Sequence, residues 1–134
     1  MALVPDASVA LKWILQEDGS DRARALAHQP LVAPDFLLLE CANVLAIQVR
    51  RGLVPPDWAR NALRALHEGP IRFLPSGPFI EDAHALGVRL SHGAYDCLYL
   101  AAALAERAMM VTADERFVRA VESDGAYSQA VRLL

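Results

Sequence analysis

Short apolar stretches alternate along the chain with longer segments whose apolar residues recur every three or four positions. The short stretches predict strands, and the longer segments predict helices with a buried face. Prolines and glycines fall mostly between these segments and separate one element from the next. The predicted strands are residues 2–4, 71–74 and 109–112, with a last strand within residues 128–134. The predicted helices are residues 8–15, 20–27, 35–51, 58–68, 79–90, 94–107 and 113–123, and residues 31–36 are taken as the approach to the third helix.

This alternation predicts an α/β fold in which a short parallel sheet is covered by helices. The length of 134 residues indicates a single domain, residues 1–134. Hydrophobic residues make up 54% of the chain, more than in an average soluble domain. We therefore expect the protein to bury further apolar surface against a second copy of itself or another partner.

Composition also narrows the location and the chemistry. The longest uncharged apolar run, Cys97 to Ala105, is far shorter than the roughly 20 residues of a membrane-spanning helix. The N-terminus lacks the features of a signal peptide, so we expect a cytoplasmic protein with no membrane association. Cys41 and Cys97 are the only cysteines and form no CxxC pair, which disfavours a zinc site or a disulfide framework. The net charge of −3 provides no global basic field for nucleic acid.

Two acidic residues directly follow predicted strands. Asp6 comes after LVP, and Asp114 comes after MMVTA. In a parallel sheet, ligands bind beyond the carboxyl ends of the strands, so these two side chains share one edge if their strands are neighbours. The alternative is that each aspartate only caps the helix that follows it, because Asp is a favoured N-cap. The sequence leaves both interpretations open.

Two further acidic residues lie within apolar helix patterns. Glu40 falls on the same helical face as Leu37 and Val44, in the middle of an apolar stripe. Asp96 begins a segment, AYDCLYLAAALAER, that is apolar on all sides and therefore predicts a buried helix. A buried ion pair is the alternative explanation for Glu40, and a favourable interaction with the helix dipole is the alternative for Asp96.

Four carboxylates that converge on one cleft would repel one another unless a cation lies between them. Oxygen ligands without Cys or His favour Mg²⁺ or Mn²⁺ over zinc. Aspartyl-phosphate chemistry of the receiver-domain or haloacid-dehalogenase type usually needs a lysine after a late strand, but Lys12, the only lysine, lies in the first helix. The motifs GxxxxGK[ST], GxGxxG and GxSxG are absent, which disfavours nucleotide-binding loops and a serine hydrolase.

The stretches VPDASVALKW, APDFLLLECANVL, AYDCLYLAAALAE and VTADERF occur in this order over residues 4–117. Together they resemble the PIN-domain ribonucleases, and most specifically the VapC-type toxins of VapBC toxin–antitoxin pairs. The resemblance implies a three-layer α/β/α fold and hydrolysis of RNA phosphodiesters with Mg²⁺ or Mn²⁺. It also implies that Asp6, Glu40, Asp96 and Asp114 are the catalytic and metal-binding residues, with Asp6 and Asp96 as principal ligands.

The resemblance also implies neighbours of the site and partners. Asn43 and Thr112 match positions that commonly lie beside the acidic residues, although a helix-surface amide and a strand-end hydroxyl are equally ordinary roles. A small antitoxin protein and a homodimer are the expected partners, besides the RNA substrate. The alternative functions are a PIN nuclease of RNA processing and a catalytically silent PIN interaction domain.

Several other side chains have two interpretations each. Four arginines are candidates for phosphate contacts, but exposed arginines at helix ends are common. They are Arg50, Arg51, Arg116 and Arg119. Trp13 and Trp58 could stack on bases or anchor an antitoxin segment, but core or dimer contacts are the more usual role of such residues. His92, four residues before Asp96, is expected to face solvent from a loop rather than to join the site.

Overall fold

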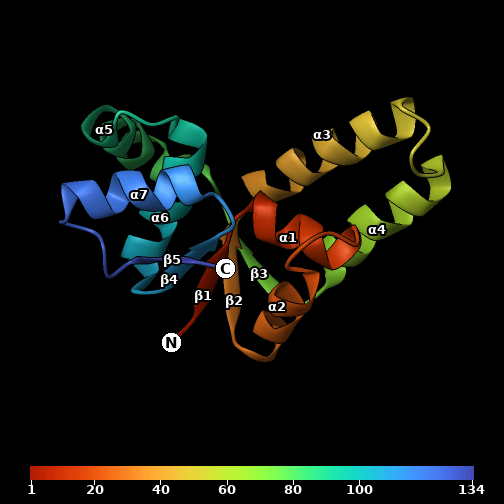
Figure 1. The fold of residues 1–134 in the computed structure, drawn as a ribbon, viewed down its shortest axis with the longest axis horizontal. Coiled ribbons are helices and arrows are strands. Elements are labelled where there is room, and N and C mark those ends of the chain that lie inside the picture. Colours follow the sequence, from red (N-terminus) through yellow and green to blue (C-terminus); the bar gives the residue numbers. More distant parts are fainter.

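Five short parallel strands form the centre of the protein, and all 134 residues are described in the computed structural model (Figure 1). The strand order in the sheet is β3-β2-β1-β4-β5. Paired residues such as Leu3 and Met109, or Leu31 and Ile71, fix the register. The strands are β1 (Leu3–Pro5), β2 (Leu31–Pro34), β3 (Ile71–Leu74), β4 (Met109–Thr112) and β5 (Val131–Leu133).

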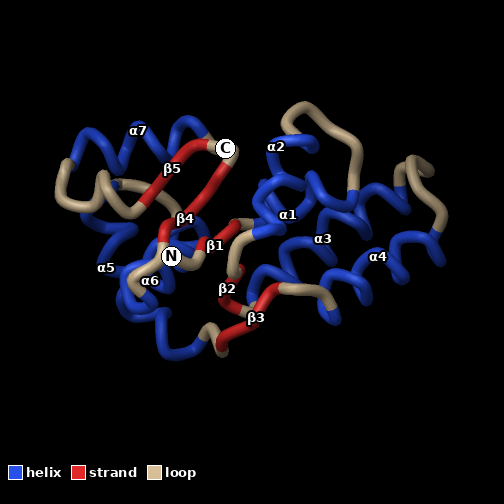
Figure 2. The backbone as a smooth tube through the Cα atoms, turned by 90° about the horizontal axis from the view of Figure 1, so that it is seen from below, coloured by secondary structure: helices blue, strands red, loops and turns tan.

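Helices cover the sheet in two groups, as Figures 1 and 2 show from two directions. The first group is α1 (Ala7–Ile14), α2 (Ser20–Ala25), α3 (Phe36–Arg50) and α4 (Pro56–Glu68). The second group is α5 (Ile80–Leu90), α6 (Ala94–Glu106) and α7 (Glu115–Asp124). Single 3₁₀ turns occur at Leu26–His28 and Gly77–Phe79. The predicted three-layer α/β/α fold is therefore confirmed.

The direction in which the chain crosses the sheet changes between β1 and β4. From β1 the chain proceeds to β2 and then β3, whereas from β4 it proceeds to β5 on the other side. Ligands in open α/β sheets bind at the carboxyl ends of the strands where such a reversal occurs, because the loops diverge there and leave a crevice. The topology thus identifies the end of β1 and β4 as the place for a site.

The bounds of β3 and β4 agree with the prediction from sequence, but β2 was not predicted. Residues 31–34 form a strand rather than the approach to α3. All four residues of β2 are buried, since helices cover both faces of the sheet. A parallel strand buried on both faces shows no alternation of polar and apolar residues, so LVAP gave no strand pattern.

Helix α6 is the most deeply buried helix. Its residues from Cys97 to Ala103 are all buried, as the apolar pattern predicted, and it packs on α5 and on β1, β2 and β4. Asp96 stands in its first turn, immediately before this buried stretch. None of the helices combines the length and the apolarity that crossing a membrane requires.

Candidate metal centre

Asp6 lies directly after β1, at the crevice between β1 and β4. Its backbone N–H donates to the carbonyl of Val111, 3.2 Å away, and this bond extends the pairing of the two strands by one residue. Asp6 is buried, and its side chain is also the N-cap of α1, because Oδ1 accepts from the backbone N–H of Val9 at 3.2 Å. The capping role predicted as an alternative is thus present together with the location at the sheet edge.

Two hydroxyl groups hold the carboxylate of Asp6 from either side. Ser8 Oγ donates to Oδ1, and Thr112 Oγ1 donates to Oδ2. Each hydroxyl also accepts a backbone N–H from the loop after β4, Ser8 from Ala113 at 3.0 Å and Thr112 from Asp114 at 3.1 Å. Thr112 is fully buried beside the site, which agrees with the position that the resemblance implied.

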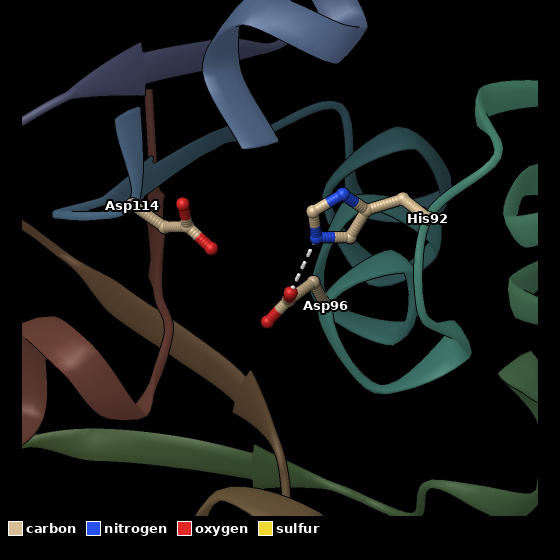
Figure 3. Close-up of side chains that lie close together, drawn as sticks. All are labelled: His92, Asp96 and Asp114. Carbon is tan, nitrogen blue, oxygen red and sulfur yellow. Dashed lines mark hydrogen bonds and ion pairs between the residues drawn. The ribbon is translucent and has the colours of Figure 1, made fainter. Parts of the chain in front are cut away.

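Asp114 lies two residues after β4 and caps α7. Its Oδ1 accepts from the backbone N–H of Phe117 at 3.2 Å, so it too combines the two predicted roles. Its other oxygen is available to a ligand. In Figure 3 its carboxylate points towards that of Asp96, which approaches from the start of α6 on the opposite side of the crevice.

His92, Asp96 and Asp114 form a cluster in which one ligand atom from each lies within 4.8 Å of the others (Figure 3). The ring Nε2 of His92 is 2.7 Å from Oδ2 of Asp96. The expectation that His92 faces solvent is wrong, since only 11% of its side chain is exposed. The ring packs edge-on against Phe117, a residue far along the chain, and the sequence gives no local sign of this contact. The i, i+4 spacing from Asp96 was the one available signal.

Glu40 approaches from the second turn of α3, where it is partly buried. The hydroxyl of Tyr99, which is buried in α6, donates a hydrogen bond to Oε1 of Glu40. The alternative of a buried ion pair does not hold for Glu40. Among the ion pairs of the structure, the only one that includes any of the four acidic residues joins Asp96 to His92.

The charges of the acidic residues act on one another. Burial raises the pKa of Asp6, the hydrogen bonds from Ser8, Thr112 and Val9 oppose this, and the charge of Asp96 raises it further. Burial also raises the pKa of Glu40, and after the opposing bond from Tyr99 the charges of Asp6 and Asp96 add to the increase. Asp6, Glu40 and Asp96 are therefore close enough to repel, while Asp114 joins them through Asp96 and through Thr112.

The residues present fit a hard divalent cation. Carboxylates with raised pKa values, drawn together without a lysine or arginine partner, are stabilised in the ionised form by a cation. The donors are carboxylate oxygens with one imidazole beside them and no thiol, a set that suits Mg²⁺ or Mn²⁺. The prediction of oxygen donors remains a prediction, and His92 lies beside these donors in the cluster.

We expect the stability of the metal-free protein to fall with rising pH because of Asp6. Its pKa is raised in the folded state, so the folded protein holds this proton to a higher pH than the unfolded chain, whose value is near 3.8. The resulting stabilisation is present below that value and is lost as pH rises through the folded pKa, by at most about 1.4 kcal/mol per pH unit.

Urea unfolding in EDTA measures this effect as the free energy of unfolding of wild type and of Asp6→Asn at pH values from about 4 to 7. The free energy of unfolding of wild type relative to the variant should decrease as pH rises. A difference that stays level or increases would mean that Asp6 is readily ionised without metal.

The predicted phosphate-binding arginines fall into two groups. Arg50 and Arg51 lie at the far end of α3, about 15 Å along the helix from Glu40. Arg116 and Arg119 are exposed on α7, directly after Asp114, and Arg119 is 3.9 Å from Glu115. Asn43 is exposed one turn after Glu40. Of the two groups, only the arginines of α7 lie on a helix that starts at one of the acidic residues. A phosphate-binding role remains a prediction for all four arginines.

Trp13 and Trp58 line a groove between α1, α2 and α4, away from the acidic cluster. The groove has a volume of about 650 Å³, and its other walls are mainly apolar, including Ile14, Ala62 and Leu66. The indole N–H of Trp13 donates to the carbonyl of Ala23 at 2.6 Å, whereas Trp58 is 42% exposed. Neither tryptophan is a fully buried core residue.

The chain is similar to known proteins over most of its length. Residues 3–122 match the family described as the PIN domain. Ribonuclease VapC3 of Pyrobaculum aerophilum is 32% identical over 120 residues, which cover 87% of this chain and 92% of that protein.

Two solved structures have a similar fold. PAE2754 from Pyrobaculum aerophilum aligns with a TM-score of 0.67 and 22% identity, covering 90% of this chain and 87% of that one. VapBC2 from Rickettsia felis, bound to a DNA fragment from its promoter, gives a TM-score of 0.69 at 13% identity, with 99% and 98% covered.

The fold and the cluster define an α/β protein with an acidic centre at the carboxyl ends of the strands of a parallel sheet. The side chains of this centre are of types that can hold a divalent cation. With the match over residues 3–122, the chain belongs to the PIN-domain family. The sequence motifs predicted a resemblance to VapC-type ribonucleases, and the similarity of this chain to VapC3 confirms that prediction.

Proposed function

We propose that this chain, as a single PIN domain of residues 1–134, is a metal-dependent endoribonuclease and the toxin of a VapBC toxin–antitoxin pair. The observation that supports the proposal is that Asp96 and Asp114 meet beside His92 at the β1–β4 crevice of a PIN domain, where the charges of Asp6, Glu40 and Asp96 act on one another. None of these carboxylates has a lysine or arginine partner. The RNA substrate, the cognate antitoxin and the homodimer are part of this proposal, as is the Mg²⁺ or Mn²⁺ ion.

Asp6, Asp96 and Asp114 would hold the cation, and Glu40 would complete the site. When bound, Mg²⁺ or Mn²⁺ would activate a water molecule and stabilise the negative charge that develops on the phosphoryl group. Ser8 and Thr112 orient the carboxylate of Asp6, and Tyr99 orients Glu40. Glu40 has a raised pKa and is suited to accept a proton from the attacking water. Arg116, next to the cluster in sequence, is a candidate to contact the RNA backbone.

Cleavage of structured RNAs by the purified protein tests the catalytic part of the proposal. With Mg²⁺ or Mn²⁺ we expect fragments with linear phosphate ends and no 2′,3′-cyclic phosphate, because water is the nucleophile, and no cleavage in EDTA. Fragments with cyclic phosphate ends would mean that the RNA 2′-hydroxyl attacks instead. Cleavage that persists in EDTA would mean that the reaction needs no divalent cation.

The groove between α1, α2 and α4 is the proposed binding site for a segment of the antitoxin. It is apolar and carries a half-exposed tryptophan, the kind of surface that an apolar segment of a partner covers.

Induced expression of the chain should arrest growth, and co-expression of a short open reading frame beside its gene should relieve the arrest. Arrest by wild type but not by Asp96→Asn would separate toxicity by catalysis from toxicity by overexpression.

Tyr99→Phe should weaken cleavage by about tenfold near neutral pH, the lower end of the effect of residues that orient metal ligands. The variant removes the hydrogen bond that opposes the raised pKa of Glu40, so that pKa rises further and the acidic limb of the rate profile moves to higher pH. The pH dependence of cleavage measures both effects.

Tyr95→Phe is the matched control, since Tyr95 lies on the same helix and is largely exposed. This control should leave both the rate and the profile as in wild type. An unshifted acidic limb in Tyr99→Phe would show that Glu40 does not limit the rate at low pH.

A further inference from the structure

His92 contacts the acidic cluster through one defined hydrogen bond. Its Nε2 is 2.7 Å from Oδ2 of Asp96. An ionised carboxylate can only accept hydrogen bonds, so Nε2 carries a proton and donates it. A protonated nitrogen offers no lone pair to a metal, and in Figure 3 the other ring nitrogen lies on the side of the ring away from the Asp96 carboxylate. The bond occupies Oδ2 and leaves Oδ1 of Asp96 for a cation.

Phe117 connects His92 to the opposite side of the cluster. The two rings meet edge to face, with centroids 4.8 Å apart and planes at 68°. Phe117 is fully buried, and its backbone N–H donates to Oδ1 of Asp114. The same residue therefore supports the ring that holds Asp96 and the backbone group that holds Asp114.

We propose that His92 is a positioning residue, which holds the carboxylate of Asp96 opposite that of Asp114 so that both reach one cation. Asp96 comes from α6 and Asp114 from the start of α7, so the separation of their carboxylates depends on how these helices are joined. His92 lies in the loop before α6, and its contact with Phe117 of α7 joins the starts of the two helices at the cluster itself. Groups that orient metal ligands typically change metal affinity 10- to 100-fold when they are removed. This inference rests on the proposed metal-dependent function.

Two substitutions of His92 separate the hydrogen bond from the packing. His92→Phe keeps an aromatic ring against Phe117 but removes the donor, whereas His92→Gln removes the ring and retains an N–H donor of similar reach. His84→Phe is the matched control, because His84 is exposed on α5. The dissociation constant of Mn²⁺ is measured by electron paramagnetic resonance and that of Mg²⁺ by competition, with circular dichroism to verify folding. If His92→Phe does not fold, His92→Leu removes the donor with a smaller side chain.

The Mn²⁺ and Mg²⁺ affinities of His92→Phe should both fall, about 10- to 100-fold, while those of His92→Gln should stay much closer to wild type. Unchanged affinity in His92→Phe, or a larger loss in His92→Gln than in His92→Phe, would overturn the proposal. Equal losses in both variants that are greater for Mn²⁺ than for Mg²⁺ would overturn it in favour of direct ligation by the imidazole, which favours Mn²⁺ over Mg²⁺. Wild type that binds neither ion would overturn the proposed function itself.

Discussion

Asp96→Asn is expected to make the metal-free protein more stable and to abolish RNA cleavage. The carboxylate of Asp96 raises the pKa values of both Asp6 and Glu40, so its removal relieves repulsion, on the order of 1 kcal/mol. Asparagine still accepts the hydrogen bond from His92 through its carbonyl oxygen. Cleavage should fall at least about 100-fold, since even groups that only orient a metal ligand contribute 10- to 100-fold.

Thermal unfolding in EDTA and with added Mn²⁺ measures the stability part of this prediction. Mn²⁺ should raise the midpoint of wild type by mass action, because the ion binds the folded state, and should raise that of the variant much less. Asp82→Asn is the matched control. Asp82 is the third residue of α5, as Asp96 is of α6, and both lie in the acidic first turn of their helices.

The control distinguishes the two explanations of Asp96 that the sequence left open. If Asp96 serves only the helix dipole, both variants should lose about 0.3–1 kcal/mol of stability and neither should change the Mn²⁺ response. Opposite signs in the two variants, with the Mn²⁺ response reduced only in Asp96→Asn, would place Asp96 at a metal centre. Loss of stability in both would remove the electrostatic basis of the proposed function.

Capping and ligand binding are not competing roles in this fold. Asp6 and Asp114 each use Oδ1 to accept a backbone N–H at the start of the following helix. A carboxylate has room for about four hydrogen bonds or ligands, so the cap leaves the second oxygen of Asp114 available and fixes its direction. The local preference of Asp for N-caps thus places these side chains at the sheet edge, with their orientation set before any ion binds.

The sequence predicted the parts of the fold and site that depend on local patterns. The positions of Asp6 and Asp114 after strands followed from the parallel sheet, and the burial of α6 followed from its apolar residues on every side. The position of Glu40 within an apolar stripe of α3 also marked it as unusual.

The parts that the sequence did not reveal depend on contacts between distant segments. β2 has no polar face because helices cover both sides of the sheet, so its four residues show no period. His92 turns inward from the loop before α6 because Phe117 of α7 packs against its ring. The hydrogen bond from Tyr99 to Glu40 likewise joins α6 to α3 across the sheet edge. None of these contacts has a signature within a single stretch of residues.

Leu100→Ala should cost about 2–5 kcal/mol of the free energy of unfolding, a large fraction of the stability of an ordinary domain. Leu100 lies one turn after Asp96, is 0% exposed and belongs to the buried core. Its truncation opens a cavity where α6 packs, and the surrounding helices and strands can close it only in part. Urea unfolding of the metal-free protein measures the loss.

Leu104→Ala provides the comparison, because Leu104 lies one turn further along the same helix and is 39% exposed. With less apolar surface to lose and no closed cavity to create, it should cost less than about half as much as Leu100→Ala. Burial of α6 from Cys97 to Ala103 is what fixes Asp96 against the repulsion of Asp6 and Glu40. Equal costs for the two leucines would mean that α6 is not held in this way, and the position of Asp96 would then require the metal ion itself.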